Sequence, residues 1–245
     1  MQQALRAGRV SSARGKLANA AAVAGTHAAR RAAASAGRRA SIFKALHDCV
    51  IEKGYSATSL ADVARTAGMS PSHLLYYFAG KEAILARYFA LMTRRITERL
   101  DTFRTEDPRR QIDLVATLFF ASKGISKSEI GFMLECFGVA VHDKEIQREK
   151  TELDRFCKAY LRELFERFPR RLADPVNTAE VAYALLVGLR TATYFDERLA
   201  PEHALELFRT HMVYLAESAP RARNARRAAP AAVRARRRNG KAAPD

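Results

Sequence analysis

The sequence predicts an all-α protein, and three observations lead to this prediction. Apolar residues recur at helical spacing through most of the chain, Ser, Pro and Gly stand where helices begin and end, and no run alternates with the period of a β-strand. We expect an N-terminal three-helix helix-turn-helix domain, a larger helical domain, and a disordered basic tail at each end. The expected ranges are 1–37 for the first tail, 38–84 and 85–217 for the two domains, and 218–245 for the second tail.

The two tails carry the whole charge excess of the chain. Lys and Arg number 42 against 26 Asp and Glu, a formal charge of +16, but residues 41–217 hold equal numbers of both signs. The tails are rich in Ala and Arg and have few large apolar residues, so they cannot bury enough surface to offset the entropy of ordering. Each tail is either a solvated extension or an arm that collects phosphate groups by counterion release. The first also resembles an Arg-rich transit peptide.

The first two helices are marked by an apolar stripe, a glycine and a cap. Apolar residues recur at i, i+4, i+7 and i+8 in the first helix: Ile42, Leu46, Cys49 and Val50. Gly54 follows in the position that commonly ends a helix. Ser59 and Asp62 have capping-box spacing, which predicts a second helix from there to about Ala67.

A third, short helix follows the turn at Gly68. Ser70–Pro71 supplies an N-cap and a proline at the first helical position, and the helix is expected to continue to Tyr77 or Phe78. At 100° per residue, Leu74 and Phe78 fall on one side and face the core. The opposite side carries a hydroxyl, an imidazole and a phenol, and no acid: Ser72, His73 and Tyr76. This side suits a DNA groove, where such groups reach base edges and phosphates.

Lys81 begins a long helix that is expected over residues 81–103. The helix dipole disfavours a cation there, which favours a bound phosphate as its partner; the alternative is an exposed lysine balanced by Glu82. Thr58 and Ser59, at the start of the second helix, offer hydroxyl and backbone N–H groups for another phosphate.

Three motifs stand in register along the run from Gly54 to Leu85: GYSATS, DVARTAGMS and YYFAGKEAIL. With the first helix, about residues 40–85, this run resembles the N-terminal DNA-binding domain of the TetR family of bacterial transcriptional regulators. The resemblance implies that residues 85–217 form a helical ligand-binding and dimerisation domain. It implies a cytoplasmic, sequence-specific, double-stranded-DNA-binding repressor that a small-molecule effector releases from a palindromic operator. The implied DNA-binding residues are Thr58, Ser59, Ser70, Ser72, His73, Tyr76, Tyr77 and Lys81. Leu75 stands where the family often has a tyrosine, and a leucine suits a thymine methyl better than a phosphate.

Five further helices are expected at about 109–123, 128–142, 144–168, 177–195 and 202–217. The last two are predicted to form a homodimer through residues 177–217, which would place two recognition helices on a palindromic site. The first of them has a stripe of small residues: Ala184, Gly188 and Ala192. The second carries large apolar residues at helical spacing: Leu205, Phe208, Met212 and Leu215. Packing within one chain explains either helix alone equally well.

Residues 109–195 are rich in aromatic side chains. In the family such residues commonly surround a cavity for a small apolar ligand, whereas ordinary core packing is the alternative. The candidate ligand-binding residues are Phe119, Phe132, Cys136, Phe137, Phe156, Tyr160 and Arg190. Glu135, His142 and Arg190 are polar groups that either orient a ligand or pair with one another or with the partner chain.

Several other functions have no support in the sequence. No apolar run is long enough to span a bilayer, and Cys49, Cys136 and Cys157 are far apart, which is typical of reduced buried thiols in an intracellular protein. HExxH, GxSxG and P-loop motifs are missing and the six His are scattered, so we expect no catalytic residue, metal or cofactor. The remaining alternative is a non-specific architectural nucleic-acid-binding protein that acts through its basic tails.

Overall fold

The computed structural model describes residues 29–121, 124–169 and 174–218, and all regular elements in these ranges are helices. This confirms the all-α prediction. The disorder predicted for residues 1–28 and 219–245 lies outside the described residues. No helix among the described residues has both the length and the apolar character that a membrane span requires.

The helices follow the predicted ranges closely. The first helix covers residues 29–53, and it is followed by α2 (Leu60–Thr66), α3 (Pro71–Leu75), α4 (Lys81–Asp101), α5 (Pro108–Phe120), α6 (Lys127–Ala140), α7 (Lys144–Glu166), α8 (Pro175–Phe195) and α9 (Pro201–Ser218). The third helix is shorter than predicted, because its regular part ends at Leu75 and Tyr76 is its C-cap.

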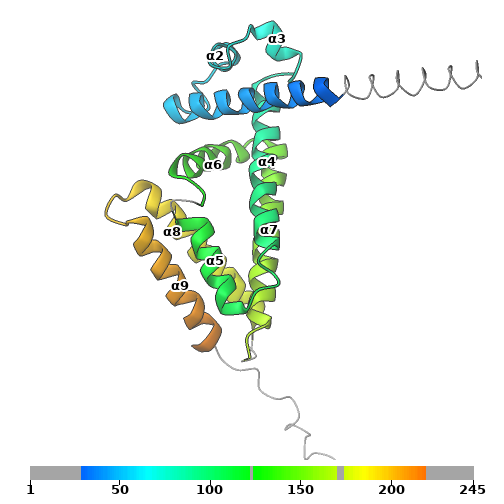
Figure 1. Cartoon of the computed structure of the whole chain (residues 1–245). Coiled ribbons are helices and arrows are strands. Elements are labelled where there is room, and N and C mark those ends of the chain that lie inside the picture. Colours follow the sequence, from blue (N-terminus) through cyan, green and yellow to red (C-terminus); the bar gives the residue numbers. More distant parts are fainter. Residues whose placement is uncertain (1–28, 122–123, 170–173, 219–245) are drawn as a thin grey trace, which may run out of the picture. The chain divides into compact units, whose positions relative to one another are not determined.

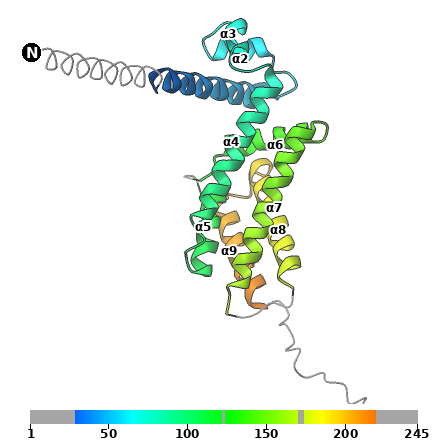
Figure 2. The ribbon, with the colours of Figure 1, turned by 90° about the vertical axis from the view of Figure 1, so that its right-hand side faces the viewer.

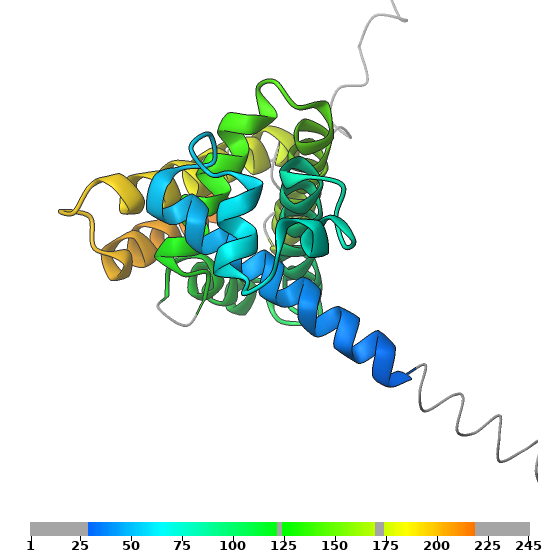
Figure 3. The same ribbon diagram turned by 90° about the horizontal axis from the view of Figure 1, so that it is seen from above.

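Residues 29–37 are helical, so the predicted disorder of the first tail was wrong for this segment. Their side chains are almost all exposed and make no core, which is why periodicity gave no signal. Alanine has the highest helix propensity, and adding residues to an existing helix avoids the cost of nucleation. The packed part of the first helix, from Ile42 onward, therefore extends into the Ala-rich segment before it. Figure 3 shows this end of the helix passing beyond α2 and α3.

The described chain forms two compact units. Unit 1 contains the residues up to Arg99 together with Ile125–Asp154, and unit 2 contains Leu100–Gly124 and the residues from Arg155 onward. Helix α4 continues through residues 84/85, where the sequence predicts a domain boundary, and α6 packs with the N-terminal helices. Sequence spacing alone gave no sign of that packing.

In unit 1, α2 and α3 lie on one side of the first helix (Figure 1). Their shared core contains residues from the first helix, α2, α3, α4 and α6, including Leu46, Val63, Leu74, Leu85 and Phe132, each at most 1% exposed. The His47 ring stacks on Phe132 of α6, and its Nε2 lies 2.6 Å from Ser128 Oγ. Helix α6 is thus part of the support for the helix-turn-helix.

In unit 2, α9 packs against both α5 and α8 (Figure 2). The Phe120 and Phe208 rings meet with their centroids 5.6 Å apart. One buried polar pair lies in this unit: Tyr160 Oη donates to Gln111 Oε1 at 2.9 Å, and the Gln111 amide donates to the Glu106 carbonyl at 2.9 Å. The pair satisfies the polar atoms of both side chains where water is excluded.

Candidate nucleic-acid interface

The start of α2 has the predicted capping box. Ser59 Oγ accepts a hydrogen bond from Asp62 N at 3.1 Å, while the Asp62 carboxylate accepts from Ser59 N at 2.9 Å. The same carboxylate forms ion pairs with Lys53 and Arg65. The hydrogen bond from Lys53 and those from Ser59 lower the pKa of Asp62 well below its usual range. Asp62 is the only acid between Gly54 and Gly80, and its charge is therefore compensated.

Helix α3 begins and faces the core as predicted. Ser70 is its N-cap and accepts from His73 N at 3.2 Å, with Pro71 at the first helical position. Leu74 is fully buried and Phe78 nearly so. Gly68 has a φ of +66°, which allows the chain to turn between α2 and α3 at no steric cost.

The outer side of α3 is open to solvent. Ser72 and His73 are exposed, Tyr76 is 83% exposed and Leu75 is 48% exposed. Tyr77 is half-buried, and its ring lies edge-on to Tyr76 and 5.5 Å from the His73 ring. The structure thus brings the predicted imidazole, phenols and hydroxyls together on one surface without an acidic side chain. We call Ser70, Ser72, His73, Tyr76 and Tyr77 the α3 face.

Lys81 has partners within the protein. Its Nζ donates to the Tyr55 carbonyl at 3.0 Å and to the Thr58 carbonyl at 2.7 Å, and it lies 4.2 Å from the centroid of the Tyr55 ring. These contacts compensate the cation at the helix start, so its position no longer indicates a phosphate. Lys81 instead connects the start of α4 to the turn before α2.

The Thr58 hydroxyl also has a partner within the protein. Its side chain is buried, and its hydroxyl donates to the Gly54 carbonyl at 2.8 Å. Ser59 remains exposed, but its hydroxyl serves the capping box. Of the two residues predicted to hold a phosphate here, Thr58 is structural, and Ser59 presents an outward hydroxyl that already has a partner.

One polar contact between the turn and α6 was not predicted. Glu135 Oε2 accepts from Tyr55 N at 2.9 Å, and both carboxylate oxygens lie 3.8 Å from where a Cβ on Gly54 would stand. Gly54 has a φ of +79°, in the left-handed region. The sequence indicated only that Glu135 is polar among apolar neighbours. Its partner is a backbone amide 80 residues away, for which no sequence pattern exists.

The seven candidate ligand-binding residues are divided between the two units. Unit 1 holds Phe132, Cys136 and Phe137, and unit 2 holds Phe119, Phe156, Tyr160 and Arg190. Phe132 and Cys136 are fully buried in the core of unit 1. In unit 2, Arg190 donates to the Phe119 carbonyl. The seven residues therefore do not form a common lining within either unit. Ordinary core packing, the alternative to a ligand cavity, accounts for Phe132 and Cys136.

Both parts of the chain match known protein families. Residues 42–88 match the family described as bacterial regulatory proteins, tetR family, and residues 108–217 match the C-terminal region of the BetI-type transcriptional repressors. The chain is 24% identical over 170 residues to the HTH-type transcriptional regulator BetI of Yersinia pestis, covering 68% of this chain and 83% of that protein. It is 23% identical over 141 residues to BetI of Stenotrophomonas maltophilia, covering 56% and 70%.

Two solved structures share the fold. A transcriptional regulator from Rhodococcus superimposes with a TM-score of 0.66 at 17% identity, covering 74% of this chain and 97% of the other. A regulator from Saccharomonospora viridis, solved in complex with choline, has a TM-score of 0.64 at 17% identity, covering 73% and 97%. The capped α2–turn–α3 unit and the shared architecture agree with the matches to both parts of the chain. The chain therefore belongs to the TetR family of bacterial transcriptional regulators.

Proposed function

We propose that this protein is a cytoplasmic transcriptional repressor, not an enzyme, that binds a palindromic operator as a homodimer and is released by a small-molecule effector. The observation that carries the proposal is the α3 face. Its exposed hydroxyl, imidazole and phenol groups stand on a helix whose other side is anchored in the core by Leu74 and Phe78. A major groove admits a helix of this kind, and such groups can hydrogen-bond base edges and phosphates.

The last two helices support a homodimer through residues 177–217. Large apolar side chains are exposed on both: Val181 and Phe195 on α8, and Tyr214 on α9. Ala184 and Gly188 are exposed as well, and nothing lies within 4 Å of a Cβ built on Gly188, so a second helix can approach closely there. Exposed apolar surface of this kind marks an interaction site. A two-fold axis through it would repeat the α3 face for the second half of a palindrome.

The experiment is the selection of bound sites from a pool of random duplexes with the purified protein. We expect a palindromic consensus whose half-sites are about one helical turn apart. Removing residues 1–28 and 219–245 should keep this consensus and make the salt dependence of binding shallower. Loss of nearly all affinity on removal of the tails would contradict the proposal.

Tyr76 provides the residue-level test. Tyr76→Ala should weaken binding to the selected duplex by about 1–3 kcal/mol if the side chain touches a base, with a smaller loss on a scrambled duplex. Tyr76→Phe separates the hydroxyl from the ring. Ile51→Ala, an exposed apolar change on the first helix, is the matched control. Equal losses on both duplexes would mean that Tyr76 contacts only the DNA backbone.

A further inference from the structure

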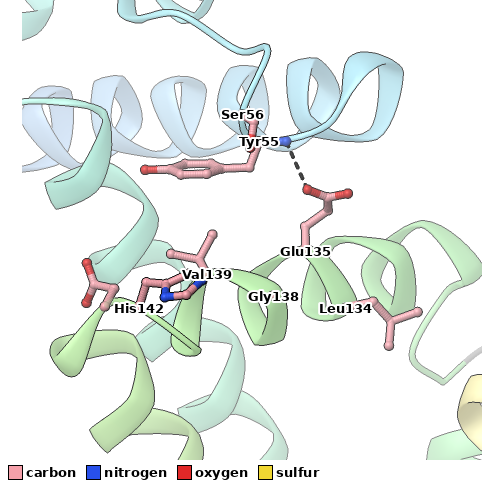
Figure 4. Close-up of a pocket in the computed structure, with 8 residues that line it drawn as sticks. Tyr55, Ser56, Leu134, Glu135, Gly138, Val139 and His142 are labelled. Carbon is pink, nitrogen blue, oxygen red and sulfur yellow. Dashed lines mark hydrogen bonds between the residues drawn. The ribbon is translucent and has the colours of Figure 1, made fainter.

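A cleft of about 450 Å³ lies in unit 1 between the turn after the first helix and the C-terminal half of α6 (Figure 4). Leu134, Gly138 and Val139 contribute apolar surface, while Tyr55, Glu135, His142 and Asp143 contribute polar groups. The cleft contains none of the residues of the α3 face and none of the seven candidate ligand-binding residues. The sites described above therefore do not explain its polar lining.

The hydroxyl of Tyr55 is the first sign of a ligand. The side chain is only 9% exposed, and its Oη has no hydrogen-bond partner among the described residues. Figure 4 shows the ring lying between the turn and α6, with the hydroxyl directed toward the end of α6 that carries Val139 and His142. A phenylalanine would pack there without the penalty of burying a polar group. A hydroxyl in this position is explained if a bound molecule supplies its partner.

The charges of the cleft are the second sign. Glu135 uses Oε2 to accept from Tyr55 N, and Asp143 uses Oδ1 to accept from the backbone amides of Glu145 and Ile146 at the start of α7. Each carboxylate has a second oxygen outside these bonds. Glu135 and Asp143 are the lining residues with a formal charge. The nearby Lys81 Nζ, 4.2 Å from the centroid of the Tyr55 ring, already donates to the carbonyls of Tyr55 and Thr58 and pairs with neither carboxylate, so the two carboxylates favour a bound cation.

The order of these groups along the chain suggests the form of the cation. Glu135 stands at one end, Gly138 and Val139 follow one turn later, and His142 and Asp143 come after α6 ends at Ala140. An apolar stretch therefore separates two carboxylates. A molecule with a cation at each end and methylene groups between them matches this sequence of surfaces, because ammonium groups hydrogen-bond to carboxylates and methylene groups pack on apolar side chains.

We propose that this cleft binds a linear alkyl diammonium ion. One ammonium donates to Glu135, the other donates to Asp143 and to the phenol oxygen of Tyr55, and the alkyl chain covers Val139. The site is separate from the α3 face, and the proposal does not depend on any operator.

The test measures binding of 1,4-diaminobutane to the full-length protein by calorimetry and by the NMR shift of the Tyr55 amide, at fixed salt and without DNA. We expect the diamine to bind about tenfold or more tightly than n-butylamine, because the second charged end adds a charge-assisted hydrogen bond. The neutral 1,4-butanediol should not shift the Tyr55 amide.

Two variants and one control assign the binding to the cleft. Glu135→Gln keeps an acceptor for Tyr55 N and should weaken diamine binding about tenfold, as should Tyr55→Phe, which keeps the ring. Glu152→Gln removes one negative charge from an exposed position of α7 outside the cleft and should change nothing. Thermal unfolding checks that both cleft variants are folded.

Equal binding of diamine and diol, or equal losses in Glu135→Gln and Glu152→Gln, would overturn the proposal, since the first excludes a charge preference and the second indicates attraction to the whole protein. A protein that binds no preferred duplex but passes this test would refute the proposed function and leave the diammonium site standing.

Discussion

Replacing Lys81 with methionine tests whether this ammonium supports the protein or contacts DNA. Nζ donates to the carbonyls of Tyr55 and Thr58, at 3.0 and 2.7 Å, and lies over the Tyr55 ring. Methionine keeps an unbranched apolar stem but removes the charge and all donors. The variant therefore removes three contacts at once without opening a large cavity.

The size of the effect follows from these contacts. A hydrogen bond from a charged group contributes about 1.5–3 kcal/mol, and a cation–π contact at a partly exposed site about 0.5–1 kcal/mol. Lys81 is half-buried, so water can replace part of each bond. We expect Lys81→Met to reduce the free energy of unfolding by about 2–3 kcal/mol.

Urea unfolding followed by circular dichroism measures this change. Lys44→Met is the control, because Lys44 is 77% exposed and pairs only with Asp48 one turn away; it should cost less than about 0.5 kcal/mol. If Lys81 bound a phosphate instead, stability would stay the same and the salt slope of DNA binding would fall by about 1. That combination would refute the structural role.

Three further predictions concern other contacts. The Lys53 hydrogen bond and the cap lower the pKa of Asp62, so its stabilisation exists above the unfolded-state pKa and is lost as the pH falls through the folded value. Asp62→Asn should thus lower the melting temperature at pH 7 and progressively less below about pH 4; a constant deficit would contradict this. Tyr160→Phe leaves the buried Gln111 oxygen unpaired and should cost about 1–3 kcal/mol in urea unfolding, whereas an unchanged midpoint would mean that the amide finds another donor. Val181→Asp, at a position 55% exposed, should give a folded monomer by sedimentation, and a persisting dimer would place the interface elsewhere.

The elements that the sequence predicted best are those whose signals are local. The Ser59–Asp62 capping box and the Ser70–Pro71 start each lie within four residues, and both are present. Gly54 and Gly68 both have the positive φ that the turns around α2 require. The side of α3 that faces the core was predicted from the rotation of 100° per residue along a helix. Such features depend on neighbours along the chain, so the sequence contains them.

The contacts that the sequence did not predict are made with backbone atoms far away in the chain. Lys81 bonds to carbonyls 23 and 26 residues earlier, and Glu135 bonds to an amide 80 residues earlier. A backbone acceptor has no residue type, so composition and spacing cannot reveal it. The Thr58 hydroxyl likewise bonds to a backbone acceptor, the Gly54 carbonyl, which the sequence did not indicate.

All three cysteines of the chain are buried, and burial also raises the pKa of the Cys136 thiol. A maleimide reagent, which attacks exposed thiolates, should therefore leave the folded protein unlabelled. Leu75 is half exposed on α3, and Leu75→Cys would introduce an accessible thiol. A fluorophore attached there would report on the surroundings of α3 without prior removal of any native cysteine.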